Sequence, residues 1–120
     1  MPESAPPIFE PPTHVVELAI DGARFRLDGC SNGATQGYNG AEIRAVDGTR
    51  VRLVSEVDGA SKIIVFRPGA ERGVTLEGCS RVEMTQSTSR HGGSVRGRAS
   101  VLCDEKGVRV EGTVLLGSCG

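Results

Sequence analysis

Hydrophobic and polar residues alternate in short runs along most of the chain after residue 13, and Gly-containing turns separate the runs. Such alternation places every second side chain on one face of a strand, so the pattern predicts half-buried antiparallel strands. No stretch of ten residues combines a 3.6-residue period with helix caps, and we therefore expect no long helix. The chain is predicted to be all-β, an antiparallel β-sandwich or small barrel built from consecutive hairpins.

The first hairpin is predicted from Asp21-Gly22, a dipeptide typical of two-residue type I′ turns. This turn places the apolar side chains of both strands on one face and an opposite-charge pair on the other. The expected pairs are Val16 with Leu27, Leu18 with Phe25, Ile20 with Ala23, and Glu17 with Arg26.

Three further turns predict the hairpins that follow. Asp58-Gly59 is interpreted as another two-residue turn, whereas Asp47-Gly48 fits better as a three-residue loop with Gly48 in the left-handed region. Residues 104–107 are expected to form a four-residue loop. The expected pairs are Val51 with Phe66, Leu53 with Ile64 and Val57 with Ala60; Ile43 with Val51 and Ala41 with Leu53; Val101 with Val110 and Cys103 with Val108.

The four cysteines favour two disulfides, because an even number in a small β-rich domain is typical of proteins from oxidising compartments. Four buried free thiols in a cytosolic protein are the alternative. No Cys-x-x-Cys pair is present and both histidines lie far from the cysteines in sequence, so no metal site is expected. The residues concerned are Cys30, Cys79, Cys103 and Cys119, with His14 and His91.

Three disulfide connectivities are possible, and the strand pattern favours one of them. Residues 74–84 are expected to pair with residues 95–103 across a loop over 86–93, which places Leu76 opposite Cys103. The preferred connectivity is Cys79 with Cys103 and Cys30 with Cys119.

Residues 1–13 carry five of the six prolines and predict an extended, disordered tether ahead of a single all-β domain over residues 14–120. A lipid-anchored envelope protein has such a spacer after its leader, and a terminal segment without a role is the alternative. No lipidation motif is present, so contact with a membrane is expected only through an N-terminal anchor preceding residue 1.

Charge and motifs narrow the function classes. Fourteen basic and fifteen acidic residues give a net charge of −1, which removes the general electrostatic case for a nucleic-acid partner. No nucleophile elbow, zinc-protease helix, Walker loop or dinucleotide fingerprint occurs, so neither an enzyme nor a cofactor is expected.

Two segments are candidates for recognition. The loop over residues 31–40 is rich in small residues and holds the chain's one tyrosine, so Gln36, Tyr38 and Asn39 are predicted to contact a partner. Residues 90–98 are locally basic, and Arg90, Arg96 and Arg98 are predicted to bind an anion. A mobile connector and a solvated strand face are the respective alternatives.

The sequence therefore predicts a non-catalytic β domain, exported to the periplasm, the cell surface or the medium, that binds another protein or self-associates. A small secreted inhibitor or immunity-type protein acting through the 31–40 loop is the first alternative. A carrier of a small ligand is the second.

Overall fold

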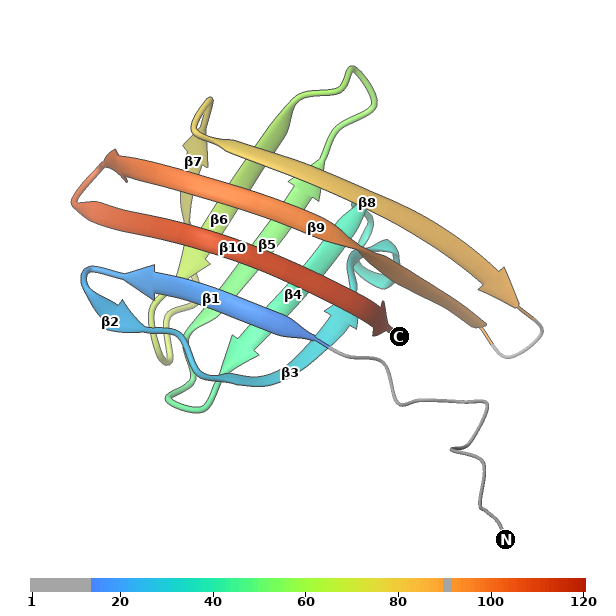
Figure 1. Cartoon of the computed structure of the whole chain (residues 1–120), viewed down its shortest axis with the longest axis horizontal. Coiled ribbons are helices and arrows are strands. Elements are labelled where there is room, and N and C mark those ends of the chain that lie inside the picture. Colours follow the sequence, from blue (N-terminus) through green and yellow to red (C-terminus); the bar gives the residue numbers. More distant parts are fainter. Residues whose placement is uncertain (1–13, 90–91) are drawn as a thin grey trace, which may run out of the picture.

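The computed structural model describes residues 14–89 and 92–120, so the predicted tether, the predicted anion-binding residue Arg90 and the adjacent His91 lie outside the described residues. Two five-stranded antiparallel sheets pack face to face, which confirms the all-β sandwich (Figure 1). The described residues hold no helix long and apolar enough to cross a membrane.

Each sheet is assembled from nearly consecutive strands. The first sheet has the order β2-β1-β10-β9-β8, and the second has the order β3-β4-β5-β6-β7. The strands are β1 (Val15–Ile20), β2 (Ala23–Arg24), β3 (Leu27–Asn32), β4 (Gly40–Ala45), β5 (Arg50–Ser55), β6 (Ser61–Phe66), β7 (Val74–Glu77), β8 (Ser80–Ser89), β9 (Gly92–Glu105) and β10 (Val108–Cys119), with one 3₁₀ helix, η1 (Gly33–Gln36).

The chain changes sheet after β2 and again after β7, and the strands of the two sheets cross steeply in Figure 1. Between them lies a core of aliphatic side chains from both sheets. Its fully buried members include Leu18, Ile43, Leu53, Ile63, Leu76, Val95 and Val110.

The first predicted hairpin is correct near its turn and wrong beyond it. Ile20 pairs with Ala23, and the Phe25 amide donates to the Leu18 carbonyl. The chain then passes to the second sheet. The predicted pairs Val16–Leu27 and Glu17–Arg26 are therefore wrong, and the partners observed are Val16 with Val114, Glu17 with Thr113, and Leu27 with Ala45. Alternation indicates which side chains face the core. It does not indicate which sheet a strand joins, because both sheets bury their apolar side chains in the same core.

Of the Asp47-Gly48 and Asp58-Gly59 turns, the first was predicted correctly and the second was not. Gly48 has φ 96°, and the three-residue loop pairs Ile43 with Val51 as expected. The Asp58-Gly59 turn also has three residues, because the Glu56 amide donates to the Ala60 carbonyl. The predicted register there is wrong by one residue, since the continuous apolar run of β6 does not reveal which residues face inward. The pairs observed include Val51 with Val65 and Leu53 with Ile63.

The turn between β9 and β10 is tighter than predicted. Lys106 and Gly107 have φ 54° and 75°, and Val110 pairs with Cys103 rather than with Val101. The register is shifted by two residues, so Cys103 keeps its core-facing position with 1% exposure. The four-residue loop expected over 104–107 is therefore wrong, although the buried face was assigned correctly.

The disulfide connectivity is confirmed, although part of the argument for it is not. Cys79 bonds to Cys103 and Cys30 bonds to Cys119. Residues 80–84 pair with β9 as predicted. The loop predicted over 86–93 is wrong in part, because residues 86–89 and 92–93 continue the two paired strands. β7 joins β6, and Leu76 lies opposite Ile63 instead of Cys103. Two disulfides indicate an oxidising environment.

The Cys30–Cys119 disulfide links β3 of the second sheet to the C-terminal end of β10 in the first sheet. A side chain makes another link between sheets. The Ser61 hydroxyl of β6 accepts from the Val82 amide and donates to the Val82 carbonyl, at the outer edge of β8.

Candidate binding site

A nearly buried carboxylate lies on the solvent side of the second sheet. In β4, Ala41 and Ile43 face the core, so Glu42 between them faces outward. Its exposed fraction is nevertheless only 5%. Acidic side chains are rarely buried this far without paired charges, so positively charged groups are expected beside Glu42 on this face.

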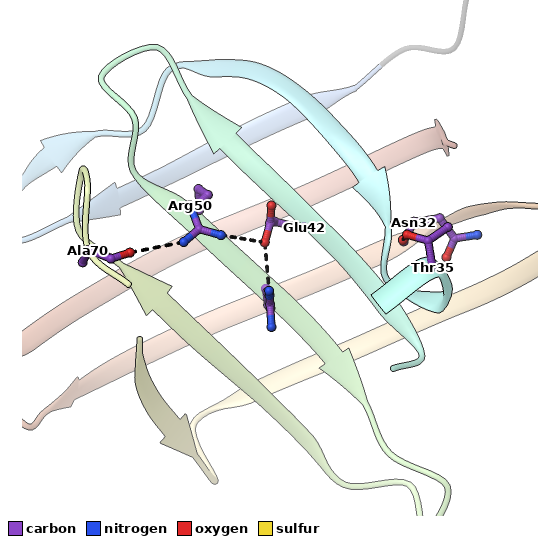
Figure 2. A network of polar contacts seen from close by, with 6 residues as sticks. Asn32, Thr35, Glu42, Arg50 and Ala70 are labelled. Carbon is purple, nitrogen blue, oxygen red and sulfur yellow. Dashed lines mark hydrogen bonds and ion pairs between the residues drawn. The ribbon is translucent and has the colours of Figure 1, made fainter. Parts of the chain in front are cut away.

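Two arginines of the neighbouring strand β5 supply the paired charges. Arg52 lies directly opposite Glu42, and its Nε donates to Glu42 Oε1 at 3.1 Å. Arg50 Nη1 donates to the same oxygen at 3.3 Å, and Arg50 Nη2 donates to the Ala70 carbonyl at 3.3 Å (Figure 2). One carboxylate therefore faces two guanidinium groups, which leaves one positive charge in excess.

Aromatic rings support both guanidinium groups. The Arg50 Cζ lies 4.2 Å from the centre of the Phe66 ring, and the Arg52 Cζ lies 5.0 Å from it. The Arg52 Cζ is also 5.5 Å from the centre of the Tyr38 ring. These cation–π contacts hold the arginines over the sheet and cover Phe66, which faces outward yet is 7% exposed. We call Tyr38, Glu42, Arg50, Arg52 and Phe66 the Glu42 cluster.

Tyr38 enters the cluster from the loop after η1. Its ring occupies the space where a side chain at residue 33 would lie, so Gly33 is required there. The Tyr38 hydroxyl is buried and makes no hydrogen bond to any described residue. Burial raises the pKa of Tyr38 to about 12, so the phenol is a neutral O–H group.

An amide network fixes the same loop to the first sheet. Asn32, with 2% exposure, exchanges two hydrogen bonds with Gln86 of β8 at 2.9 and 3.0 Å. Gln86 Nε2 also donates to Asn39 Oδ1 at 3.2 Å. Asn32 caps η1 by accepting from the Ala34 amide. The loop that holds Tyr38 is therefore anchored to both sheets.

The structure separates the three residues predicted to contact a partner. Tyr38 belongs to the Glu42 cluster, Asn39 is bonded to Gln86, and Gln36 is exposed on η1. Their role in partner binding stays a prediction.

Two of the residues predicted to bind an anion lie on the outer face of the first sheet. Arg98 Nε donates to Glu83 Oε1 at 2.8 Å, and Arg81 also pairs with Glu83 at 3.2 Å. The hydrogen bond and the charge of Arg98 lower the pKa of Glu83. Arg96 is exposed two residues along the same strand. Glu83 partly offsets the local positive charge, and anion binding there stays a prediction.

Sequence reasoning missed four members of the cluster: Glu42, Arg50, Arg52 and Phe66. The signal was present in the correctly predicted three-residue loop at Gly48. That register places Arg52 opposite Glu42 and Arg50 opposite Arg44, so an acidic residue among three arginines was predictable on the outer face.

Glu42→Ala is expected to lower the free energy of unfolding by about 2–3 kcal/mol, because two arginines then face each other without a counter-charge. The loss stays below that of a fully buried pair because the arginine side chains are 28% and 30% exposed. Urea unfolding measures it. Glu83→Ala is the matched control, since Glu83 also pairs with two arginines but is 43% exposed, and only a slight loss is expected. Equal losses in both variants would contradict the assignment.

The described residues thus define a disulfide-linked antiparallel β-sandwich with an arginine–aromatic cluster on one outer face. Comparison of the chain with protein-family models, with curated proteins and with solved structures found no match.

Proposed function

We propose that the protein is a non-catalytic binding domain of the periplasm, cell surface or extracellular medium, and that the Glu42 cluster binds an acidic side chain of another protein. The observation that carries this proposal is the Arg52 guanidinium, whose side chain is 28% exposed and is held in place by Glu42 and two aromatic rings. Its N–H groups donate hydrogen bonds, and a carboxylate accepts them.

The charges of the cluster support an anionic partner. The single carboxylate of Glu42 accepts from both Arg50 and Arg52 through its Oε1. Two guanidinium groups against one carboxylate give the cluster one excess positive charge. Within the described residues the Arg52 guanidinium donates through Nε, so its two terminal nitrogens remain for a ligand. A planar guanidinium presents such a pair in the geometry that matches a carboxylate.

Preorganisation supports binding at this face rather than a purely structural role. The two rings and Glu42 restrict the arginine side chains before a partner arrives, which reduces the entropy lost on association. Arginine and tyrosine are also the residue types that dominate binding energies in protein interfaces.

The test uses immobilised peptides that carry Asp or Glu, each matched with its Asn or Gln counterpart. Wild-type protein is expected to bind a subset of the acidic peptides in preference to the amide forms. Arg52→Ala is expected to weaken that binding about tenfold or more, the usual loss for a hydrogen bond between charged groups. Arg96→Ala is the control, because Arg96 is an exposed arginine on the other sheet.

Three outcomes would overturn the proposal. Unchanged binding by Arg52→Ala would place the partner elsewhere, for example on Gln36 in the 31–40 loop, as the inhibitor alternative requires. Equal weakening by Arg96→Ala would indicate general charge attraction. A small molecule that co-purifies with the protein and displaces the peptides would favour the carrier alternative.

A further inference from the structure

The Cys30–Cys119 disulfide has an imidazole beside it. His14 precedes β1, and its Nε2 lies 3.8 Å from Cys30 Sγ. Cys30 Sγ also lies 3.9 Å from the Ser118 carbonyl oxygen. His14, Cys30 and Cys119 are far apart in sequence. The pairing of β1 with β10 brings His14 near the C-terminal end of β10, and the packing of the two sheets places Cys30 of β3 beside them.

A hydrogen bond from the backbone determines which nitrogen of the neutral His14 ring carries the proton. The Gly117 amide donates to His14 Nδ1 at 3.1 Å. A nitrogen that accepts a hydrogen bond carries no proton, so in the neutral ring the proton is on Nε2. The Nε2–H group is therefore directed at Cys30 Sγ, where it can donate to a thiolate.

This arrangement argues against a metal site at the same three residues. Their nitrogen and sulfur ligand atoms lie within 4.8 Å of one another, but the two sulfurs are joined in a disulfide. A metal needs the lone pair of His14 Nε2, which carries the proton in this ring state. The contact suits sulfur chemistry better than coordination.

The other disulfide provides an internal comparison. Each pair combines one half-buried cysteine, Cys30 or Cys79, with one cysteine of 1% exposure, Cys119 or Cys103. Burial therefore does not distinguish them. The nearest polar contact of Cys103 Sγ is the Cys79 carbonyl oxygen at 3.5 Å, which cannot donate to a thiolate. The His14 imidazole beside Cys30 therefore distinguishes the Cys30–Cys119 disulfide from Cys79–Cys103.

We infer that Cys30–Cys119 is an exchangeable disulfide that reacts with the thiols of a partner, whereas Cys79–Cys103 is structural. A partner dithiol reduces Cys30–Cys119 by two electrons: the dithiol becomes a disulfide and loses two protons, and the Cys30–Cys119 bond breaks. Cys119 takes up one of the protons, the other is released to solvent, and Cys30 remains a thiolate that accepts a hydrogen bond from His14 Nε2–H. This hydrogen bond stabilises the reduced state and so makes the disulfide easier to reduce.

The reverse reaction uses the same groups. The half-buried Cys30 thiolate attacks a partner disulfide, releases one partner thiolate and forms a mixed disulfide. Cys119 then loses its proton, attacks Cys30 Sγ and releases the second partner thiolate, which restores the Cys30–Cys119 bond. The less accessible sulfur thus has the resolving role.

The first test uses the wild-type protein in glutathione buffers of increasing reducing strength, with thiols trapped by N-ethylmaleimide and mapped by peptide mass spectrometry. Cys30–Cys119 is expected to be half reduced at a ratio of [GSH]² to [GSSG] at least about tenfold lower than Cys79–Cys103. Simultaneous reduction of both pairs, or earlier reduction of Cys79–Cys103, would overturn the inference.

Two variants of His14 separate its two nitrogens. His14→Asn keeps an acceptor near the Nδ1 position for the Gly117 amide and removes the donor to sulfur. His14→Gln keeps an amide donor near the Nε2 position and removes that acceptor. We expect His14→Asn to shift the midpoint of Cys30–Cys119 toward that of Cys79–Cys103, and His14→Gln to retain most of the difference.

A reversed order of the two variants would show that His14 acts through the Gly117 contact, and would overturn the inference. Adding Zn²⁺ to the reduced wild-type protein supplies a further check. We expect no stoichiometric Zn²⁺ binding. Stoichiometric binding that the His14→Asn substitution abolishes would instead establish a metal site.

Discussion

Replacing Cys30 and Cys119 together by alanine is expected to lower the free energy of unfolding by about 4.6 kcal/mol, because the bridge closes a long loop of the unfolded chain. The two cysteines are 89 residues apart. Without the bridge, the unfolded ensemble gains the conformational freedom of that loop, and the two sheets lose a covalent link. Urea unfolding of the oxidised proteins measures the difference.

The matched control is the Cys79→Ala, Cys103→Ala protein. That loop spans 24 residues, so the expected loss is smaller, about 3.4 kcal/mol on the same chain-entropy relation. Because each pair contains one cysteine of 1% exposure, the cost of the cavities is similar and largely cancels in the comparison. A larger loss in the control than in the Cys30, Cys119 variant would contradict the expectation.

Gly112→Ala is expected to cost about 3–5 kcal/mol of folding free energy or to prevent folding, because the added methyl group collides with backbone. Gly112 lies in β10 opposite Leu18 of β1 and has φ 136°, a conformation that other residues rarely adopt. A Cβ atom there would overlap the carbonyl oxygen of Glu17, and backbone on a paired strand cannot move aside cheaply.

Gly107→Ala separates the collision from backbone strain. Gly107 has φ 75° in the β9–β10 turn, and a Cβ there meets no atom within 4 Å. Only the cost of a left-handed residue is expected, about 1–2 kcal/mol. Thermal unfolding compares the variants. A loss for Gly112→Ala no larger than for Gly107→Ala would mean that β1 lies farther from β10 than described.

The sequence was sufficient to predict the fold class, because alternation reports burial regardless of which strand is the neighbour. Val16 and Leu27 both face the core, as predicted, although they pair with Val114 and Ala45 instead of with each other. Pairing after a change of sheet depends on contacts distant in sequence, and local pattern does not contain them. The β6 register failed for a different reason, since four consecutive apolar residues, 63–66, allow either face.

The candidate site could be predicted only in part. Tyr38 was singled out because it is the chain's one tyrosine, but its partners come from other strands. Glu42 resembles an ordinary solvated residue on a polar strand face. Its burial results from Arg50, Arg52 and the ring of Phe66, and the position of Phe66 depended on the register that was predicted wrongly.

The two hydrogen bonds between the Ser61 hydroxyl and the Val82 backbone have a consequence for solubility. β8 is the outermost strand of its sheet, and such strands expose backbone groups that recruit further strands into fibrils. At Val82 a hydroxyl from the opposite sheet already occupies both the amide and the carbonyl. A strand of a second molecule would have to displace this hydroxyl to extend the sheet there. The Ser61 hydroxyl thus opposes the addition of a strand at this point of the β8 edge.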